Sequence, residues 1–359
     1  MNKQIYTKII ATGSYVPADV VTNEHFLNYT FYDPATGKPF DKSNEEIVRK
    51  FYEITNIAER RWATHDEVNS DIAAKAAEAA LNSGSIDRES LDFIICCHNF
   101  GDVAYGNSRC DCMPSLANRV KKLLEISNPA CICHDLISGC PGWTQGMIVA
   151  NAYLTSKTFT RGLVIGSDLL SRIADPYDRD AMIFSDGAGA TVVEAVDSDT
   201  PTGIIAHSSR SDCNPYLNLL NLGRSYNPAH NPAERLIKMA GHKVYVYALT
   251  NVAASVKDSI DKAGLDILDI KKILIHQANE KMDEAIVKQL FRLYDKNMPD
   301  NIMPMSIRYL GNSSTATVPT LLDLIVKNNM PGHEIREGDN IVLCSIGAGM
   351  NINSIVYKW

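Results

Sequence analysis

A helix–loop–strand pattern that occurs twice in the chain is the feature that most restricts its fold. In residues 70–83, Ala, Ile and Leu recur at helical spacing, Gly84 ends the helix, and a buried strand follows at residues 91–97. The same order returns where a helix ends near residues 263–264 and a strand covers residues 270–275. Two copies of one α/β unit predict a duplicated fold. Because the copies agree only weakly residue by residue, two unrelated α/β stretches remain the alternative.

Further strands extend this pattern to both halves of the chain. They are predicted at residues 162–166 and 340–344, each followed by a Gly-containing loop. We expect an N-terminal half of residues 1–197 and a C-terminal half of residues 198–359. Within the first half, Asp-Pro, Gly and Pro recur in residues 31–43 and predict an exposed loop or hairpin.

Composition and charge restrict the class of protein. With 45% hydrophobic and 21% charged residues, the 359-residue chain is typical of a globular protein with a substantial core. The net charge of −7, with both signs interspersed, argues against nucleic-acid and membrane partners. No apolar run approaches the roughly 18 residues of a membrane span, and the start lacks a signal-peptide core, so we expect a cytoplasmic protein. Nine cysteines then indicate free thiols rather than disulfides.

Cys140 is the candidate nucleophile. Residues 132–143 predict a strand, a glycine-flanked turn that holds Cys140, and the start of a helix that continues through Leu154. Pro141 suits the first helical position, which places the sulfur beside the N-terminus of the helix. The helix dipole and the free N–H groups favour a thiolate there, so we expect a lowered pKa for Cys140. The alternative is a buried, inert cysteine.

Two other cysteine pairs invite a metal-site interpretation. They are Cys110 with Cys112 and Cys131 with Cys133. Structural zinc sites usually separate paired cysteines by two residues rather than one, and Cys131 and Cys133 would share one face of a strand. We therefore expect no metal site.

A histidine and an asparagine are candidates for polar roles beside this cysteine. His276 follows the strand at residues 273–275, and strand ends in α/β sheets point toward the ligand crevice. A neutral imidazole there can donate to a developing negative charge or transfer a proton near Cys140. The alternative is a structural, hydrogen-bonded histidine. Asn312 lies among the small residues 311–319 and can donate its NH₂ group to a carbonyl oxygen.

Two glycine-rich segments are candidates for backbone functions. Residues 345–350 lie between two predicted strands, so the helix that a dinucleotide fingerprint requires is missing. The N–H groups of Gly347, Ala348 and Gly349 suit an oxyanion hole instead. Residues 186–190 precede another predicted strand, which favours close backbone packing over nucleotide binding.

Together these features resemble the β-ketoacyl-acyl carrier protein synthase III family of thiolase-fold condensing enzymes. The resemblance rests on Cys140 at the start of a helix, His276-Gln277-Ala278-Asn279, Gly311-Asn312-Ser313-Ser314 and the terminal glycine loop, in matching order and spacing. Further matching stretches span nearly the whole chain: residues 59–63, 166–168, 175–179, 184–190 and 239–241.

The resemblance implies a duplicated, five-layered αβαβα fold, a homodimer, and an acyltransferase of fatty acid biosynthesis. In such an enzyme Cys140 accepts an acyl group from a thioester of coenzyme A or of an acyl carrier protein. Malonyl-acyl carrier protein then loses CO₂, and His276 and Asn312 stabilise the enolate that attacks the acyl-cysteine. The Cys140 N–H and one from the loop Gly347 to Gly349 hold the oxyanion. No metal or redox cofactor is implied.

The resemblance also implies four substrate-binding residues: Arg179, Met113, Leu170 and Asn279. Residues 50–54 stand where the family often places a Trp and an Arg that grip the adenine of coenzyme A, and His242 replaces the usual Asn. Recognition of coenzyme A is therefore open, although Arg179 remains. Met113 stands where a Phe of the neighbouring subunit often limits the acyl pocket, so the acyl length is also open.

Three other functions remain alternatives. A degradative thiolase has a second catalytic cysteine near a glycine loop, but Cys344 is one residue out of register for that role. A specialised condensing enzyme or acyltransferase of secondary metabolism is favoured by Pro141, Trp143 and the changes at the adenine site. A non-enzymatic subunit that only binds acyl groups would usually lack a catalytic residue, whereas this chain retains all three candidates.

Overall fold

The computed structural model describes residues 4–107 and 109–359. Its strands are β1 (Gln4–Tyr15), β2 (Asp19–Thr22), β3 (Tyr32–Asp33), β4 (Lys38–Pro39), β5 (Glu59–Trp62), β6 (Phe93–His98), β7 (Ile132–Ile137), β8 (Arg161–Leu169), β9 (Asp186–Ser198), β10 (Gly203–Ser211), β11 (Leu220–Gly223), β12 (Leu236–Met239), β13 (Ile270–Ile275), β14 (Asn340–Gly347) and β15 (Asn351–Lys358). Its α-helices are α1 (Asn44–Thr55), α2 (Asn69–Ser83), α3 (Leu116–Leu123), α4 (Gly142–Thr155), α5 (Cys213–Tyr216), α6 (Gly241–Lys262), α7 (Glu280–Arg292), α8 (Ile307–Leu310) and α9 (Thr317–Val326).

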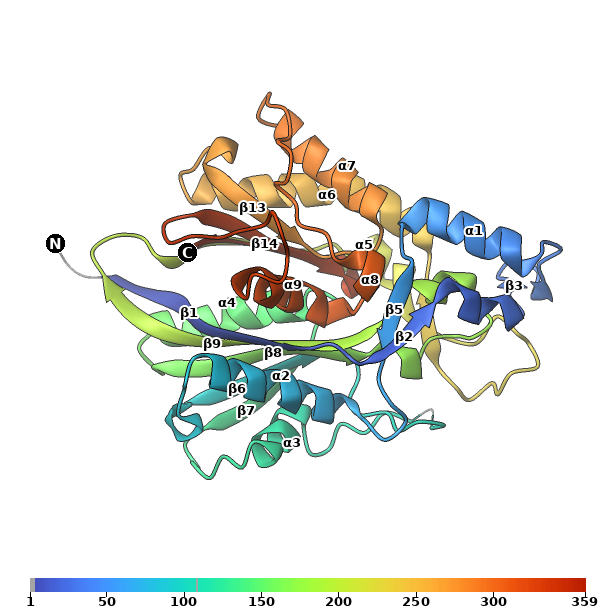
Figure 1. The fold of residues 1–359 in the computed structure, drawn as a ribbon, viewed down its shortest axis with the longest axis horizontal. Helices are drawn as coiled ribbons and strands as arrows, with labels where there is room; N and C mark the ends of the chain where they lie inside the picture. The colour runs from blue at the N-terminus through green and yellow to red at the C-terminus, as the bar shows by residue number, and fades with distance from the viewer. Residues whose placement is uncertain (1–3, 108) are drawn as a thin grey trace.

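Two mixed sheets form the frame of the molecule. The first has the order β1-β9-β8-β6-β7 and the second the order β10-β15-β14-β13. In the first sheet β6 is parallel to β7 and β8, whereas β9 runs antiparallel to β1 and β8. In the second sheet β13 and β14 are parallel, with Ile275 opposite Cys344. The strands of the first sheet end at Ser198 and those of the second begin at Gly203, so the two sheets differ in colour in Figure 1.

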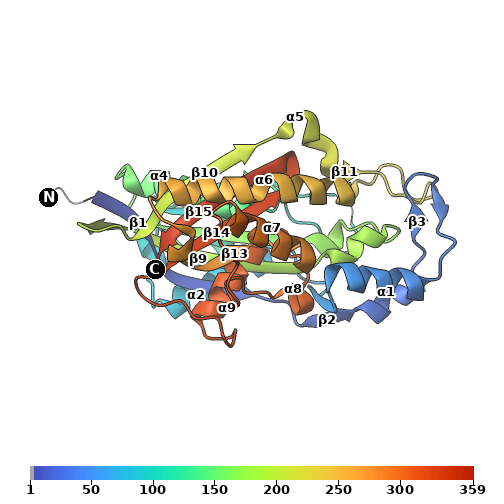
Figure 2. The ribbon, with the colours of Figure 1, turned by 90° about the horizontal axis from the view of Figure 1, so that it is seen from above.

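Helices and sheets alternate in five layers (Figures 1 and 2). Helices α2 and α3 pack on the outer face of the first sheet, α4 and α9 lie between the sheets, and α6 and α7 cover the second sheet. A helix buried on all sides must be apolar, and α4 indeed contains no charged residue. The carboxylate of α9, Asp323, is buried but accepts hydrogen bonds from Thr12 and Ser14. The predicted five-layered α/β architecture is therefore confirmed.

The elements predicted from the sequence are present, with differences at their ends. Strand β13 has the predicted bounds, whereas β8 and β14 continue beyond theirs. The hairpin expected in residues 31–43 is formed by β3 and β4, with Tyr32 opposite Pro39.

The glycine-rich segment at residues 186–190 requires a correction. It does not precede a strand but forms the first part of β9, paired with β8 and β1. The expected close packing is nevertheless found, because a Cβ atom on Gly189 would lie 2.7 Å from the backbone nitrogen of Thr320 in α9. The small residues let α9 approach the strand, and they still permit its ladder of hydrogen bonds.

Three further observations concern the described residues as a group. None of the helices there is both long and apolar enough to cross a membrane. No cluster of three or more His, Cys, Asp or Glu side chains within residues 4–107 and 109–359 has the arrangement of a metal site. All nine cysteines are free thiols.

Candidate active site

Cys140 lies in the turn between β7 and α4. Gly139 adopts a positive φ of 62°, which favours glycine, and its carbonyl accepts a hydrogen bond from the Gly142 N–H at 2.9 Å. The prediction that Pro141 is the first helical residue is wrong by one position: Pro141 is the N-cap and α4 begins at Gly142. Cys140 still lies directly before the helix N-terminus.

The expected lowering of the Cys140 pKa is also wrong. Burial of the thiol raises its pKa to about 11, and the negative charge of Asp168 acts in the same direction. A hydrogen bond from the Ser314 hydroxyl, with Oγ 3.3 Å from Sγ, acts against this rise. The position of Cys140 at the helix N-terminus was correctly inferred. The cost of desolvating a thiolate at this buried site nevertheless outweighs the local contacts that favour the thiolate.

The end of β14 lies against the backbone of Cys140. A Cβ atom on Gly347 would be 2.7 Å from the Cys140 nitrogen, so only glycine allows this approach. A Cβ on Gly139 would likewise lie 2.8 Å from the nitrogen of Ala348. Ser345 Oγ donates to the Cys140 carbonyl at 3.0 Å and fixes the strand to the turn. The predicted backbone loop is thus adjacent to the candidate nucleophile, which gives backbone N–H groups that can bind an oxyanion.

Asn312 is held by its backbone and by one side of its amide. Its N–H donates to the Ile183 carbonyl and its carbonyl accepts from the Ser185 N–H, each at 2.9 Å. Its Oδ1 accepts from the Ser314 N–H at 2.9 Å. The amide oxygen is therefore occupied, and the NH₂ group is the part of the side chain that can donate to a ligand. Ser314 connects Asn312 to Cys140.

His276 lies at the carboxyl end of β13, where its N–H donates to the Cys344 carbonyl of β14 at 2.8 Å. Burial lowers its pKa to about 4, so the imidazole is neutral near pH 7. Its Nδ1 is buried and has no hydrogen-bond partner among the described residues. The neighbouring Gln277 accepts from the Ser306 and Ile307 N–H groups and so fixes the start of α8, which leads to Asn312. His276 thus directly follows β13, the strand next to β14, and the end of β14 contacts Cys140.

Cys140 lines a cavity of about 320 Å³. Its walls are largely apolar, and Leu170, one of the predicted substrate-binding residues, is among them. The main apolar lining residues are Phe100, Ile137, Leu170, Ile173, Phe184, Leu220, Leu222 and Ile237.

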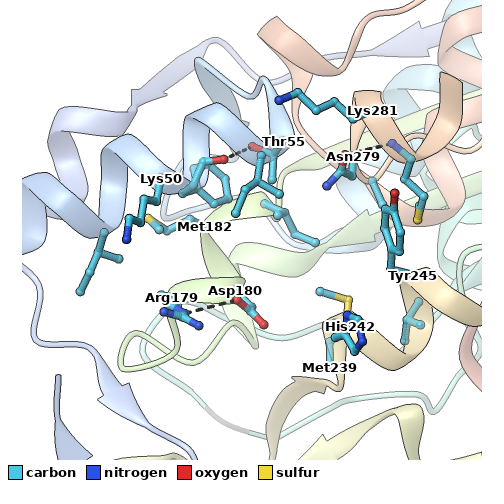
Figure 3. A pocket seen from close by; sticks show the side chains of 18 of the residues that line it. Lys50, Thr55, Arg179, Asp180, Met182, Met239, His242, Tyr245, Asn279 and Lys281 are labelled. Carbon is cyan, nitrogen blue, oxygen red and sulfur yellow. Dashed lines mark hydrogen bonds and ion pairs between the residues drawn. The ribbon is translucent and has the colours of Figure 1, made fainter. Parts of the chain in front are cut away.

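A second, larger cavity of about 750 Å³ lies between α1, α6, α7 and the 3₁₀ turn Arg179–Ile183 (Figure 3). Arg179, His242 and Asn279 line it, as do Lys50 and Ile54 from the segment that departs from the family pattern. Asn279 also caps α7, because its Oδ1 accepts from the Met282 N–H.

The positively charged side chains that line this larger cavity differ in how closely an acidic side chain pairs with them. Lys42 and Lys50 share one partner, Glu46, at 3.2 and 2.9 Å. Arg179 lies 3.8 Å from Asp180, and its guanidinium stacks 4.7 Å above the ring of Phe40, which follows the β3–β4 hairpin.

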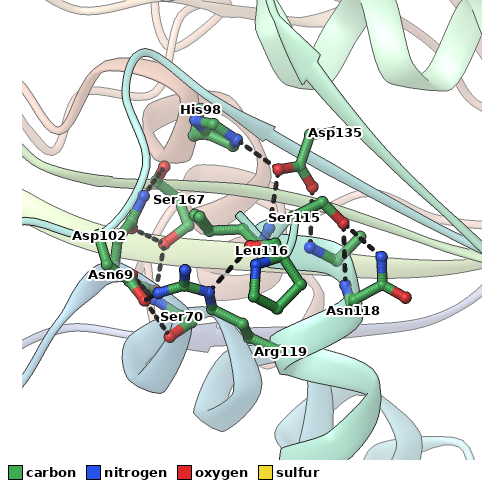
Figure 4. A network of polar contacts seen from close by, with 12 residues as sticks. Asn69, Ser70, His98, Asp102, Ser115, Leu116, Asn118, Arg119, Asp135 and Ser167 are labelled. Atoms are coloured by element: carbon green, nitrogen blue, oxygen red, sulfur yellow. Dashed lines mark hydrogen bonds and ion pairs between the residues drawn. The ribbon is translucent and has the colours of Figure 1, made fainter. Parts of the chain in front are cut away.

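Met113 is the predicted substrate-binding residue that the structure separates from both cavities. Its side chain is 88% exposed. Nearby, Arg119 pairs with Asp102 at 2.7 Å (Figure 4) and with Asp111 at 2.7 Å. Asp135 of β7 anchors the start of the adjacent α3 by accepting from its first N–H groups. Met113 thus lies at the surface, beside residues that these contacts hold together.

Sequence reasoning missed two contributors to the site. Ser314 was part of the matched Gly311-Asn312-Ser313-Ser314 string, but its contact with the Cys140 sulfur is long-range and leaves no signal in a local pattern. The stacking of Phe40 on Arg179 was missed for the same reason, although an aromatic residue beside the predicted hairpin was visible.

Comparison with known proteins places this site in a family. The family model for 3-oxoacyl-[acyl-carrier-protein] synthase III matches residues 134–213, and the model for its C-terminal part matches residues 260–359. The β-ketoacyl-[acyl-carrier-protein] synthase III of Neisseria meningitidis is 32% identical over 355 residues, 99% of each protein. Synthase III 1 of Vibrio parahaemolyticus is 33% identical over 356 residues, 99% of this chain and 100% of that protein. The chain belongs to the 3-oxoacyl-[acyl-carrier-protein] synthase III family.

Solved structures support the same assignment. The β-ketoacyl synthase III of Thermus thermophilus superposes with a TM-score of 0.80 at 30% identity, covering 98% of this chain and 99% of that one. The synthase III of Aquifex aeolicus gives a TM-score of 0.80 at 26% identity, covering 98% and 100%. The predicted thiolase fold is therefore confirmed. The two family models include Cys140, His276 and Asn312 within their matched residues.

Proposed function

We propose that this chain is an acyltransferase that condenses an acyl thioester with malonyl-acyl carrier protein, with loss of CO₂, in fatty acid biosynthesis. The position of Cys140 carries the proposal, because this residue lines an apolar cavity and its backbone nitrogen lies against Gly347. Membership of the synthase III family supports the reaction type.

In the first stage the Cys140 sulfur attacks the thioester carbonyl of the donor. The carbonyl oxygen becomes an oxyanion, which the N–H groups of Cys140 and of the loop Gly347 to Gly349 stabilise. The C–S bond of the donor then breaks, and its pantetheine thiol leaves with a proton. The acyl chain remains on Cys140 and extends into the apolar cavity of about 320 Å³, whose wall includes Leu170.

In the second stage malonyl-acyl carrier protein loses CO₂, and the electrons of the broken C–C bond form an enolate. Neutral His276 and the NH₂ group of Asn312 donate hydrogen bonds to the enolate oxygen. The enolate carbon attacks the acyl-Cys140 carbonyl, and the Cys140 thiolate leaves as the β-ketoacyl product forms. A neutral imidazole suits this role, since its pKa near 4 leaves it uncharged while it donates. These steps require no metal or redox cofactor.

The larger cavity is the proposed route for the pantetheine arm. Lys50, Arg179 and Lys281 line it and complement the negative charge of a phosphopantetheine group. Phe40 already covers the guanidinium of Arg179, and Lys50 and Ile54 stand in the segment where the family often places a Trp and an Arg. The aromatic side chains that line the cavity are instead Phe51 and Tyr245. We therefore favour an acyl carrier protein over coenzyme A as the donor.

Two proposals concern the setting of the enzyme. We propose a homodimer, because β7 is an edge strand of its sheet and exposes Ile132 and Ile137. A cytoplasmic location is supported by the nine free thiols, which a reducing compartment maintains.

Intact-protein mass spectrometry tests the proposed nucleophile. Wild type, Cys140→Ala and a control, Cys213→Ala, are mixed with acyl-coenzyme A and acyl-carrier-protein donors of several chain lengths. Wild type and Cys213→Ala, whose cysteine is exposed, should gain the mass of the acyl group, and Cys140→Ala should not. The donor that reacts identifies the substrate. No mass gain with any donor, or a gain that persists in Cys140→Ala, would contradict the proposal.

A further inference from the structure

A chain of hydrogen bonds connects the buried carboxylate of Asp168 to the Cys140 sulfur. Asp168 lies near the end of β8, and its Oδ2 accepts from Asn99 Nδ2 at 2.7 Å. The same Nδ2 donates to Ser314 Oγ at 2.7 Å, and this Oγ lies 3.3 Å from Cys140 Sγ. Three segments that are distant in the sequence therefore meet at the candidate nucleophile.

Donor and acceptor chemistry fixes the direction of the protons along this chain. An ionised carboxylate only accepts, so the Asn99 amide must present its NH₂ group to Asp168. The other N–H of this group is donated to Ser314, whose Oγ is then an acceptor. The hydroxyl proton of Ser314 therefore points away from Asn99 and is available to the Cys140 sulfur.

The competing acceptor for this proton is Asp168 itself, whose Oδ2 already accepts from three donor groups. Its Oδ2 accepts from Asn99 Nδ2 and also from Thr315, through Oγ1 at 2.8 Å and the backbone nitrogen at 3.3 Å. Its Oδ1 accepts from the Asn99 backbone N–H at 2.8 Å. Ser314 also lies close enough to Asp168 to act against the rise that burial causes in the pKa of that carboxyl. A donor from Ser314 would, however, be the fourth on Oδ2, whereas the Cys140 sulfur lies 3.3 Å from the Ser314 hydroxyl and accepts its proton.

The backbone of Ser314 indicates that its side chain serves a purpose at this position. Its φ is +54°, in the left-handed region where glycine is accommodated at lower energy than any other residue. Its N–H also donates to Asn312 Oδ1 at 2.9 Å. A glycine could make that contact with less strain, so the feature that serine adds is the hydroxyl beside Cys140.

We propose that Asp168 and Asn99 are positioning residues that direct the Ser314 hydroxyl proton onto the Cys140 sulfur and so favour its thiolate. This inference rests on the proposed role of Cys140 as nucleophile. Through its charge alone, Asp168 would disfavour the thiolate, because it raises the Cys140 pKa together with burial. The hydrogen bond from Ser314 acts in the opposite direction. The benefit of Asp168 is therefore indirect and requires both intervening side chains.

Alkylation of Cys140 by iodoacetamide measures this effect directly, because only the thiolate reacts. The rate is followed between pH 7 and 10 by peptide mass spectrometry, which separates Cys140 from the other cysteines. At pH 8, Ser314→Ala should react roughly three- to tenfold more slowly than wild type, since loss of a hydrogen bond to an anion raises the thiol pKa. Asn99→Ala should shift the rate in the same direction.

A double variant tests whether the residues act as one unit. Ser314→Ala with Asn99→Ala should be no slower than Ser314→Ala alone, because Asn99 acts through the hydroxyl. The matched control is Ser313→Ala. In wild type the Ser313 hydroxyl lies 3.4 Å from Thr317 Oγ1, so the variant should react at the wild-type rate.

A wild-type rate in Ser314→Ala overturns the proposal, as does an additive loss in the double variant. The Ser314→Ala measurement decides the question even if Asn99→Ala fails to fold. Alkylation requires no acyl donor, so this inference can fail while Cys140 still accepts acyl groups. Conversely, slower alkylation in Ser314→Ala together with no acylation of wild type would refute only the proposed enzyme function.

Discussion

At the scale of single residues, His276 shows how burial selects a protonation state. The pKa of the imidazole falls to about 4 because its surroundings cannot solvate a charge. Between about pH 4 and 6.5 the unfolded chain binds a proton at this residue and the folded chain does not. The contribution of His276 to stability is therefore present above pH 6.5 and is lost as the pH falls through 4.

This direction of the pH dependence of stability can be tested with His276→Gln, in which the side chain is neutral at every pH. Lowering the pH from 7.5 to 5 should destabilise wild type by about 2 kcal/mol more than the variant. Urea unfolding at both pH values gives the change in the free energy of unfolding for wild type and for the variant. Equal differences in wild type and His276→Gln would show that the histidine is not desolvated.

His276 and Asn312 should matter more for the second chemical stage than for the first. His276→Ala and Asn312→Ala should still acylate Cys140, because the backbone at Gly347 supplies the donors for that step. Both variants should lose most malonyl decarboxylation, typically 10²-fold or more for a donor to a developing oxyanion. Acyl-enzyme formation by mass spectrometry and release of CO₂ separate the two stages. Equal loss of both stages in either variant would contradict this division.

The sequence revealed which residues were candidates but not how their surroundings modify them. Cys140 was recognisable because it lies between a strand and a helix start and follows Gly139, and His276 because it directly follows a strand. The predicted direction of the Cys140 pKa shift was wrong because burial depends on which residues pack over the sulfur. A local sequence pattern does not identify those residues. Ser314, Asn99 and Asp168 belong to separate segments, so only the folded chain shows that they are linked.

At the scale of elements, the end of β14 determines the geometry around Cys140. In Gly347→Ala the new Cβ would lie 2.7 Å from the Cys140 nitrogen, so the strand or the turn must move. Because displacements near 1 Å at a reacting group can reduce rates on the order of 10²-fold, we expect a comparable loss of acylation.

The matched control is Gly187→Ala in β9, where the nearest atom is 3.5 Å away and no positive φ is required. It should acylate at nearly the wild-type rate. The time course of acyl-enzyme formation, followed by mass spectrometry, compares the variants. A wild-type rate in Gly347→Ala would mean that the Cys140 N–H tolerates the displacement and has no strict geometric role.

Strands bounded by polar residues were predicted well, and β13 is the clearest example because Asp269 precedes it and His276 follows it. The glycine-rich start of β9 was not recognised as strand. Its Gly and Ala residues have weak strand propensity, and their reason for being small is the approach of α9 from another part of the chain. Pairing across the sheet, rather than local preference, makes this segment extended.

At the scale of the whole molecule, the unpaired edge of β7 presents free backbone hydrogen-bonding groups and exposed apolar side chains. Within the part of the chain that the structure describes, the strand is hydrogen-bonded on one side only, to β6, and it exposes Ile132 by 37% and Ile137 by 65%. Natural edge strands are usually blocked by charges or covered. Pairing with the same edge of a second copy would satisfy the free backbone groups and bury both side chains. The loop that ends at Met113 is anchored next to this edge through Arg119 and Asp135.

A charge on this edge should therefore separate the proposed homodimer. Ile132→Lys is the suitable variant, because Ile132, unlike Ile137, is absent from the lining of the Cys140 cavity. Light scattering after size-exclusion chromatography should give a dimer for wild type and a monomer, or a much weaker dimer, for Ile132→Lys. Leu268→Lys is the control, since Leu268 is an exposed apolar residue (60%) outside the first sheet, and it should remain dimeric. If Ile132→Lys stays as dimeric as Leu268→Lys, the copies associate through another face, and the expectation that Met113 limits the acyl pocket of a neighbouring subunit loses its basis.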